Sequence, residues 1–322
     1  MKWVTYRTGQ GDRTGLVSGD VIHALAPGVR LVDLVARGAE GLRQAGESAL
    51  TSASEIVAVD EVSLAAPIPR PPSIRDSLSF LDHMRNCQEA LGGGRRLVDA
   101  WYQIPAFYFA SPTTVFGPYD DVPAAPGSVA QDFELEVAAI IGSAGYELKD
   151  LSLDEAEQAI IGYTIFNDWS ARDLQALDGQ LRIGQAKGKD SGVTLGPWLV
   201  TPDELAPHRR GSRLDLSVRA LVNGREVGSG STVQMDWSFA EVISYMSRGV
   251  PLCPGDVVGS GTVPTCTLLE HLNPADPQSF PGWLQAGDVV TLQVEGLGET
   301  RQTVRATPAP IPLVPRPRPA DG

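Results

Sequence analysis

Apolar and polar residues alternate along several short segments of the chain, the pattern typical of β-strands with one buried face. Turn-forming residues separate these segments. Between two of them stands Asn223-Gly224, a strong signal for a β-hairpin. The predicted strands are residues 3–6, 14–17, 21–23, 133–141, 162–169, 214–222, 225–228 and 289–294.

Helical segments are fewer than strands. Ser152 and Ser238 are each followed three residues later by a glutamate, the capping box that opens a helix. They predict helices that continue to about residues 160 and 248, and a short helix is predicted at residues 30–37. Because strands outnumber helices and occur in hairpins, the pattern predicts an α+β, mainly β fold that is largely antiparallel rather than doubly wound.

Proline marks the expected divisions of the chain. Four prolines fall within residues 67–72, where neither a helix nor a central strand can continue. Residues 65–72 are therefore predicted to link a small β-rich domain at 1–64 to a catalytic domain at 73–306. The proline-rich residues 307–322 are predicted to form a loose tail.

Composition narrows the function classes. The 322 residues carry a net charge of −13, which disfavours nucleic acid as a partner because phosphate binding needs a basic face. No run approaches the roughly 18 to 20 apolar residues that span a bilayer, and the N-terminus lacks the apolar region of a signal peptide. Cys87, Cys253 and Cys266 form no C-x-x-C pair, which fits buried thiols in a reducing compartment. We therefore expect a cytoplasmic protein with neither nucleic acid nor a membrane as partner.

Acidic residues stand at the start of the apolar strand 133–141. Side chains alternate between the two faces of a strand, so Glu134 and Glu136 share one face and Asp132 can join them. Neighbouring carboxylates repel unless a positive charge lies between them, and oxygen ligands select hard cations. The alternative is a solvent-facing edge strand with ordinary surface acids.

A further acid, Asp168, ends the strand 162–169. It is followed by two hydrogen-bond donors, Arg172 and Gln175. The alternative is that Asp168 or Ser170 caps the N-terminus of a helix.

Three more segments carry candidate chemistry. Asp76 and His83 are seven residues apart and would lie on one side of a helix if that segment is helical. The loop 184–192 contains Lys189 but lacks the phosphate-loop pattern, and its alternative is a flexible basic turn. The glycine-rich segment 259–262 allows its backbone to approach a ligand closely.

Taken in this order, these segments resemble the fumarylacetoacetate hydrolase family from about Asp76 to Glu270. The motifs are F-E-L-E-V (133–137), N-D-W-S-A-R-D-L-Q (167–175), G-K-D-S-G-V-T-L-G-P-W (188–198) and G-D-V-V-G-S-G-T (255–262). The resemblance implies a mixed β-sandwich roll preceded by a small barrel-like N-terminal domain, usually in homodimers. It also implies a divalent metal, Mg²⁺ or Ca²⁺ with Mn²⁺ as a further candidate.

The resemblance also implies roles for individual residues. Its metal carboxylates fall on Asp76, Glu134, Glu136 and Asp168. Its general base falls on His83, and the acid that orients this base falls on Glu270. Its oxyanion-stabilising groups fall on Arg172, Gln175 and Lys189, and its substrate contacts fall on Tyr108 and Thr262.

The chain departs from the family pattern at four positions of the substrate pocket. Two family tyrosines, an arginine and a threonine are replaced by Leu78, Gly179, Gly92 and Val193, respectively. Arg95 or Arg96 could take the place of the arginine, and Thr194 stands next to the lost threonine. The pattern therefore implies complete catalytic machinery with an altered pocket, and a substrate other than fumarylacetoacetate.

The implied activity is hydrolysis of a C–C bond in a 1,3-diketone or 2,4-dioxo acid, because a cation on the substrate oxygens stabilises the carbanion that leaves. A metal-dependent decarboxylase, isomerase or hydratase acting on oxo-acids is the first alternative. A non-catalytic binding protein is the remote one, and it predicts a broken ligand set. The presence of both Asp76 and His83 favours hydrolysis.

Overall fold

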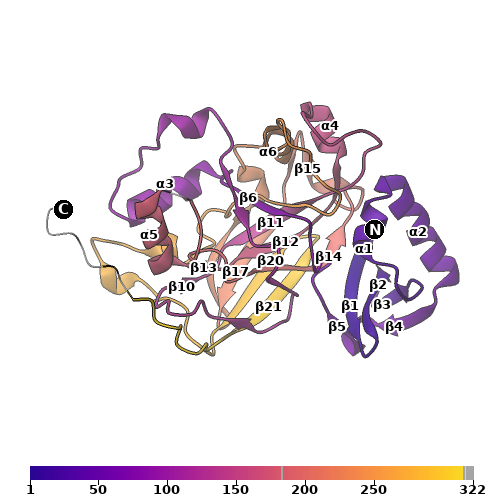
Figure 1. The fold of residues 1–322 in the computed structure, drawn as a ribbon, viewed down its shortest axis with the longest axis horizontal. Coiled ribbons are helices and arrows are strands. Elements are labelled where there is room, and N and C mark those ends of the chain that lie inside the picture. The colour runs from indigo at the N-terminus through magenta and orange to yellow at the C-terminus, as the bar shows by residue number, and fades with distance from the viewer. Residues whose placement is uncertain (183, 315, 317–322) are drawn as a thin grey trace.

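The protein is described from a computed structural model, which covers residues 1–182, 184–314 and 316. Most of the strands in this part of the chain belong to one sheet of 12 strands (Figure 1). They are β1 (Lys2–Thr8), β2 (Gly11–Ser18), β3 (Val21–Ala24), β4 (Glu55–Ala58), β5 (Ser63–Leu64), β6 (Ile74–Ser77), β7 (Phe107–Ala110), β8 (Val115–Phe116), β11 (Leu135–Ile141), β12 (Ile160–Asp168), β14 (Val193–Val200) and β19 (Val257–Gly259).

The large sheet is open. Its order runs β4-β3-β2-β1-β14-β12-β11-β19-β6-β7, with β5 beside β1 and β8 beside β14. Most neighbours are antiparallel, whereas the β19–β6 and β14–β8 pairs are parallel. The N-terminal strands continue this sheet through the pairing of β1 with β14, and so do not close into a barrel of their own.

A second sheet packs against the first. Its order is β18-β17-β20-β21-β9, and two further pairs, β10–β13 and β15–β16, are short. Its strands are β9 (Val122–Pro123), β17 (Ser217–Val222), β18 (Arg225–Ser231), β20 (Val289–Val294) and β21 (Gly298–Arg305). The short pairs join β10 (Gln131–Asp132) to β13 (Ser170–Ala171) and β15 (Arg209–Arg210) to β16 (Arg213–Leu214).

Helices lie around the sheets. The α-helices are α1 (Leu31–Val35), α2 (Gly38–Ser52), α3 (Leu81–Ala90), α4 (Leu153–Gln158), α5 (Arg172–Leu181) and α6 (Phe239–Met246). The 3-10 turns are η1 (Val59–Glu61), η2 (Asp99–Tyr102), η3 (Ala206–His208), η4 (Thr232–Gln234), η5 (Leu269–His271) and η6 (Pro277–Ser279). No helix in the described ranges is long and apolar enough to cross a membrane.

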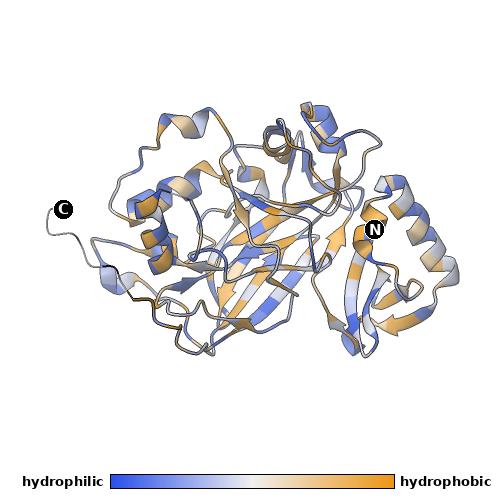
Figure 2. Cartoon of the chain, viewed as in Figure 1, coloured by the Kyte–Doolittle hydropathy of each residue, from blue (hydrophilic) through white to orange (hydrophobic). Residues whose placement is uncertain are grey.

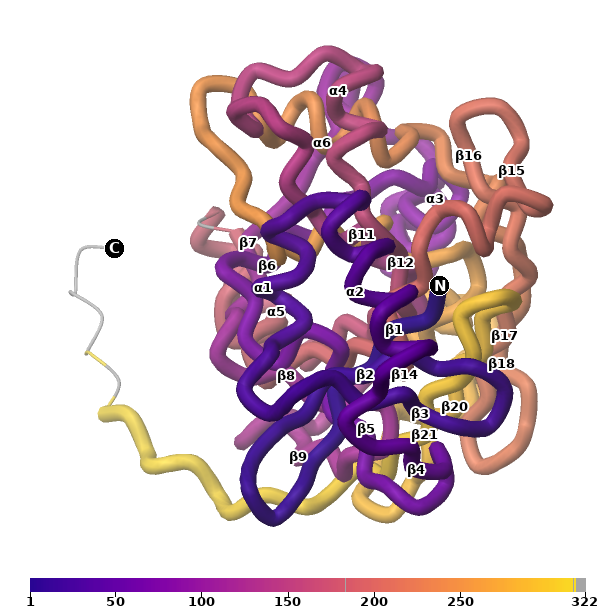
Figure 3. Tube along the Cα trace, turned by 90° about the vertical axis from the view of Figure 1, so that its right-hand side faces the viewer, coloured from indigo at the N-terminus to yellow at the C-terminus, as the bar shows by residue number. Residues whose placement is uncertain are grey.

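Both faces of the large sheet are covered, so its central strand β11 is buried along its whole length. Ala138 and Ile140 of β11 face a core shared with α1 and α2. Val137 and Ala139 face the opposite core, shared with the second sheet and α6. Figure 2 shows apolar residues along the strands between these layers, and Figure 3 views the molecule from the side of the N-terminal strands.

The predicted α+β, mainly β fold is confirmed, including both capping boxes and the Asn223-Gly224 hairpin. Both hairpin residues have positive φ, which explains the choice of asparagine and glycine there. Helix α2 was not predicted from the sequence, because Gly38, Gly41 and Gly46 weaken its helical pattern. Its Leu42 and Ala49 are nevertheless buried in the core.

One condition stated for the sequence is not met, and one expectation was wrong. Asp76 and His83 do not share a helix: Asp76 lies in β6, which pairs with β19 and β7, and only His83 lies in α3. Pairing with distant strands thus overrides the local spacing. Cys87 and Cys266 are buried as expected, but Cys253 is exposed.

The proline-rich segment 65–72 forms neither helix nor strand, and its Ala66 and Ile68 are buried in the core beneath the N-terminal strands. Residues 307–314 also lack regular structure, and residues 315 and 317–322 of the predicted tail lie outside the described residues. The division into domains at these segments stays a prediction.

Replacing Ile165 by alanine should lower the free energy of unfolding by about 2 to 5 kcal/mol, because this fully buried residue of β12 leaves a cavity between two packed layers. Ile56 of β4 is 60% exposed, so Ile56→Ala is the matched control, with an expected change of about 0.5 kcal/mol. Urea unfolding measures both. Equal midpoints for the two variants would contradict the assignment of β12 to the core.

Candidate metal centre

Four buried carboxylates converge near the middle of the large sheet: Asp76, Glu134, Glu136 and Asp168. Each contributes an oxygen, and these oxygens all lie within 4.8 Å of one another. The strand order explains the convergence. Asp76 is opposite Gly259 of β19, while Leu135, between the two glutamates, pairs with Asn167, next to Asp168.

Gly259 provides the space in which Asp76 and Glu136 meet. A Cβ atom at this position would lie 2.3 Å from Asp76 Oδ1 and 3.1 Å from Glu136 Oε2. The next residues also serve the cluster. The Gly261 amide donates to Glu136 Oε2 at 2.8 Å, and Thr262 Oγ1 lies 3.5 Å from Glu136 Oε1. The glycine-rich segment predicted to approach a ligand therefore packs against the carboxylates.

Two buried cations lie against the cluster. Lys189 Nζ donates to Glu134 Oε2 and to Asp168 Oδ2, both at 2.5 Å. Arg172 Nη2 donates to Glu134 Oε1 at 2.8 Å. The alternative of a flexible basic turn is therefore excluded for Lys189, which is buried. Neither Asp168 nor Ser170 caps α5, because its N-cap is Ala171 and has no side-chain cap hydrogen bond.

These two cations do not neutralise all four acids. Burial raises the pKa of Asp76 to about 6 and that of Asp168 to about 8. Burial, with Asp76 close by, also raises the pKa of Glu136 well above its ordinary value. At Glu134 burial acts in the same sense, but Lys189 and Arg172 outweigh it and lower the pKa. Two unit charges at the 4.8 Å limit repel by about 3 kcal/mol, at an effective dielectric constant of about 20.

The cluster fits a hard divalent cation. Asp76 Oδ1 and Asp168 Oδ1 are buried, and within the part of the chain that the structure describes neither has a hydrogen-bond partner. Unpaired carboxylate oxygens in a dry site require a cation or protons. A set made only of oxygen donors is typical of Mg²⁺, Ca²⁺ or Mn²⁺ sites.

Asp132 organises the surroundings of the cluster, a role that its sequence position did not indicate. It is fully buried, and its Oδ2 accepts hydrogen bonds from Arg172 Nε and Thr267 Oγ1, both at 2.8 Å. The backbone amides of Leu268 and Leu269 also donate to its carboxylate. Asp132 thus fixes both Arg172 and the turn that leads to Glu270.

His83 and Glu270 form a hydrogen-bonded pair, with His83 Nδ1 2.6 Å from Glu270 Oε1. Asn86 Nδ2 and the Thr265 amide donate to the other oxygen of Glu270 at 2.6 and 2.9 Å. Burial acts to lower the pKa of His83, but Cys87 and Glu270 outweigh it and raise the pKa well above its ordinary value. The charge of His83 in turn contributes to lowering the pKa of Glu134, and the hydrogen bonds of Asp132 to Arg172 and to the Leu269 amide connect the cluster with the residue next to Glu270.

The remaining predicted site residues lie around the same centre. The Tyr108 hydroxyl donates to Asp168 Oδ2 at 2.5 Å. Gln175 Oε1 accepts a hydrogen bond from Arg172 Nη1 at 3.0 Å, which leaves the Gln175 amide group as a donor. The structure therefore brings the predicted residues together; their roles stay predictions.

The altered pocket positions have different surroundings. A side chain at Gly92 or Gly179 would meet open space. Arg95 Nη1 donates to Glu89 and to Asn86, and so is connected through Asn86 to Glu270. Thr194 cannot simply replace the lost threonine, because its hydroxyl accepts from Trp169 and donates to Gln302.

The protein thus belongs to the class of mainly β proteins with a buried carboxylate centre. The family model of the fumarylacetoacetate (FAA) hydrolase C-terminal domain matches residues 73–305, so the chain belongs to the fumarylacetoacetate hydrolase family.

Individual relatives carry names from two reaction types. The 2,4-didehydro-3-deoxy-L-rhamnonate hydrolase of Sphingomonas sp. (strain SKA58) is 35% identical over 200 residues, which is 62% of this chain and 65% of that protein. The chain thus spans slightly less than two thirds of this curated relative.

Among solved structures, the fumarylacetoacetate hydrolase of Exiguobacterium antarcticum is 28% identical, with 95% of this chain and 100% of that chain covered and a TM-score of 0.73. A probable 2-hydroxyhepta-2,4-diene-1,7-dioate isomerase of Mycobacterium abscessus is also 28% identical, with coverages of 96% and 100% and a TM-score of 0.68.

Metal binding should stabilise the protein more at pH 8 than at pH 5. In the metal-free protein, Asp76 and Asp168 keep protons up to about pH 6 and pH 8, whereas in the unfolded chain they lose them near pH 4. Protonation of these two aspartates stabilises the folded state fully below about pH 4, and this stabilisation is lost as the pH rises toward 8. A cation replaces those protons, so the rise in Tm caused by Mg²⁺ should increase over this range.

Differential scanning calorimetry at both pH values measures this rise. Glu136→Gln should abolish it, whereas Glu61→Gln, at an exposed position, should leave it intact. A rise in Tm that is equal at both pH values would contradict a site made of these carboxylates.

Gly259→Ala should weaken Mg²⁺ binding by about tenfold or more, because the added methyl group displaces Asp76 from Glu136. Gly9→Ala, where nothing lies within 4 Å of the added atom, is the control. Isothermal titration calorimetry compares the two affinities, and equal values would show that Gly259 does not shape the site.

Proposed function

We propose that this protein is a divalent-metal-dependent hydrolase that cleaves a C–C bond in a 2,4-dioxo acid or a related 1,3-diketone. The observation that carries this proposal is the His83–Glu270 pair, an oriented base that hydrogen bonds through Asp132 and Arg172 connect to the carboxylate cluster. Hydrolysis needs such a base to activate water.

The chemistry of a relative supports the same substrate class. The Sphingomonas hydrolase is named for a 2,4-didehydro-3-deoxy sugar acid. Such a compound has carbonyl groups at carbons 2 and 4, one carbon apart, and is thus a 2,4-dioxo acid. Gly92 and Gly179 stand where the family pattern has an arginine and a tyrosine, so we expect a substrate tail that differs from that of fumarylacetoacetate.

Asp76, Glu134, Glu136 and Asp168 would hold the cation. When bound, it would supply Lewis-acid stabilisation of the negative charge that develops on the substrate oxygens.

His83 acts on the water. In the neutral form of His83, which predominates above its raised pKa, Nδ1–H donates to Glu270 and Nε2 can take a proton from water. The resulting hydroxide adds to the distal carbonyl carbon. When the C–C bond breaks, its electron pair stays on the carbon between the two carbonyls, and His83 returns the proton to that carbon. The products are a carboxylic acid and a 2-oxo acid.

Lys189 and Gln175 would stabilise the oxyanion formed when water adds. Lys189 has three N–H donors, of which two contact Glu134 and Asp168, so one remains. Gln175 offers its amide group, and each such donor is typically worth about 3 to 4 kcal/mol. Arg172 contacts Asp132, Glu134 and Gln175 and would act by positioning the latter two.

Isomerisation of an unsaturated oxo-acid is the second candidate, because a solved relative that is 28% identical carries the name of an isomerase. The same cation and base could move a proton between carbon atoms. This reaction needs no activated water, and the Glu270-oriented His83 therefore favours hydrolysis.

The two reactions differ in product mass. The purified protein with Mg²⁺ is offered 2,4-dioxo acids with alkyl or hydroxylated tails, and products are followed by mass spectrometry. Hydrolysis gives two fragments whose summed mass exceeds that of the substrate by one water, whereas isomerisation leaves the mass unchanged. Unchanged mass with every dioxo acid, together with turnover of an unsaturated oxo-acid, would replace the first candidate by the second.

His83→Ala should reduce hydrolysis by about 10² to 10⁴-fold, because the general base is lost. The rise in Tm with Mg²⁺ should persist, since His83 is not among the four carboxylates. His208→Ala, at a histidine outside the site, is the control. Hydrolysis at the full rate in the His83 variant would rule out this residue as the base.

A further inference from the structure

Cys87 lies against the proposed general base but has no part in the proposed hydrolysis. His83 and Cys87 are four residues apart on α3 and thus lie on one side of this helix. The Cys87 sulfur is 3.7 Å from both ring nitrogens of His83. Glu270 Oε1 approaches His83 Nδ1 from another element, at 2.6 Å.

The three side chains have the donor types and spacing of a zinc site. One ligand atom from each of His83, Cys87 and Glu270 lies within 4.8 Å of the other two. Around a tetrahedral zinc ion, with bonds of about 2.0 to 2.3 Å, neighbouring donors are about 3.3 to 3.7 Å apart. The sulfur–Nδ1 distance already matches, and the His83–Glu270 contact needs to widen by less than about 1 Å.

Neighbouring groups hold these donors in place. Asn86 and the Thr265 amide engage Oε2 of Glu270, so its Oε1 remains available to a metal ion. Such contacts orient metal ligands in known sites.

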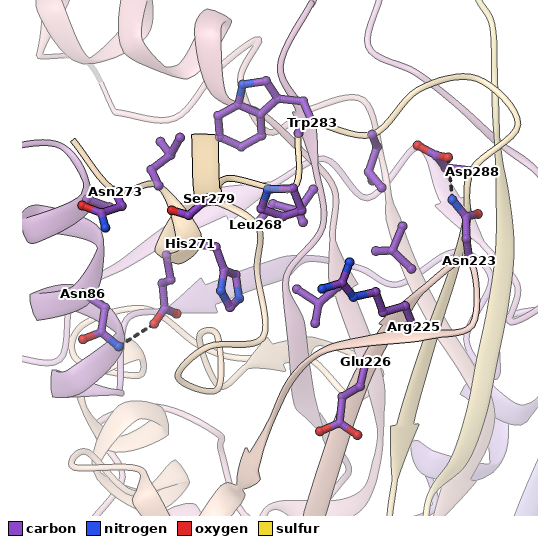
Figure 4. Close-up of a pocket in the computed structure, with 18 of the residues that line it drawn as sticks. Asn86, Asn223, Arg225, Glu226, Leu268, His271, Asn273, Ser279, Trp283 and Asp288 are labelled. Carbon is purple, nitrogen blue, oxygen red and sulfur yellow. Dashed lines mark hydrogen bonds between the residues drawn. The ribbon is translucent and has the colours of Figure 1, made fainter. Parts of the chain in front are cut away.

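A large cavity reaches Glu270, whereas His83 and Cys87 are not among the described residues that line it. It has a volume of about 890 Å³, and its lining includes Asn86, Ala90, Glu270 and His271 (Figure 4). The dashed line at Asn86 in Figure 4 marks its bond to Glu270. None of the four carboxylates of the metal centre is among the described residues that line this cavity. An ion can therefore approach Glu270 from a side that the carboxylate cluster does not line.

We infer that His83, Cys87 and Glu270 form a second metal site that is selective for borderline-soft ions such as Zn²⁺. An ion bound there inactivates the enzyme because it occupies the general base, His83. The inhibition rests on the proposed function, whereas the binding does not. A thiolate and an imidazole favour Zn²⁺ or Co²⁺, whereas the all-oxygen cluster favours Mg²⁺ or Ca²⁺. The two sites would thus bind different ions because their ligand atoms differ.

The inhibition follows from the position of one proton. A metal ion on Nδ1 displaces the proton that Glu270 accepts, and the Cys87 thiol loses its proton to solvent on binding. Neutral imidazole carries one N–H, so with Nδ1 bound to metal the hydrogen stands on Nε2. That nitrogen can then no longer accept a proton from water. The ion would act as an inhibitor without entering the carboxylate site.

Cobalt provides the test, because a thiolate ligand gives Co²⁺ a sulfur-to-metal charge-transfer absorption. Co²⁺ is titrated into the full-length protein in the presence of excess Mg²⁺. The absorption should rise to one equivalent and should be bleached by Zn²⁺. It should be lost in Cys87→Ser and in Cys87→Ala, with an unchanged Tm verifying that the variants are folded.

Two control variants identify the source of the absorption. Cys253→Ser removes the exposed thiol, and Glu136→Gln disables the carboxylate cluster; both should retain the band. Absence of the band in the unaltered protein, or its persistence without Cys87, would overturn the second site.

A separate measurement addresses inhibition. If the protein hydrolyses a dioxo acid, the Zn²⁺ concentration for half-inhibition should rise by about tenfold or more in Cys87→Ser, each rate being taken relative to the same variant without Zn²⁺. An unchanged value would overturn the inhibitory role. If hydrolysis itself is absent, the proposed function fails, while the cobalt band still decides whether the site exists.

Discussion

Repulsion among four buried carboxylates is the constraint around which this structure is built. Asp76, Glu134, Glu136 and Asp168 come from different parts of the chain and meet where water cannot screen them. Lys189 and Arg172 compensate part of the charge, and Gly259 gives the acids room to approach one another. The rest of the charge has to be met by protons or by a cation, which is why a purely structural role for the cluster is hard to reconcile with its burial.

A network of hydrogen bonds connects the four carboxylates with their surroundings. Asp132 holds Arg172 on one side and the backbone of residues 268–269 on the other. Glu270 follows immediately in the chain. The geometry of the His83–Glu270 pair therefore depends on Asp132, which also orients Arg172 beside Glu134. The candidate base and the candidate metal site are thus parts of one connected polar core, enclosed by the two apolar layers that cover the large sheet.

Sequence reasoning identified those parts of the site that depend on local geometry. The spacing of Glu134 and Glu136 was informative because strand alternation is a local property, and Asp168 stood out at the end of a strand. The family motifs supplied the remaining ligands. The spacing could not give the position of Asp76, which is set by the pairing of β6 with β19 more than 180 residues later. Nor could it give the role of Asp132, whose partners Arg172, Thr267, Leu268 and Leu269 are distant in sequence. Cys87 looked like an ordinary core thiol, because only the folded chain places Glu270 beside it. The mainly β fold was predictable, whereas helix α2, with its three glycines, was not.

The pairing of β1 with β14 has a consequence for how this architecture can vary. β14 is bonded to Lys2 and Trp3 at one end, while at its other end Val193 pairs with Asp168. The region that the family model matches, 73–305, therefore shares a sheet with the N-terminal strands. A chain shortened to that region would leave the edge of β14 at Leu199 and Val200 unpaired and open to pairing with another molecule. Recombination that exchanged the first 64 residues among relatives would have to preserve strand register and core volume together. The N-terminal part of the chain is thus expected to diverge on its outer surface and to change only slowly where it faces β14.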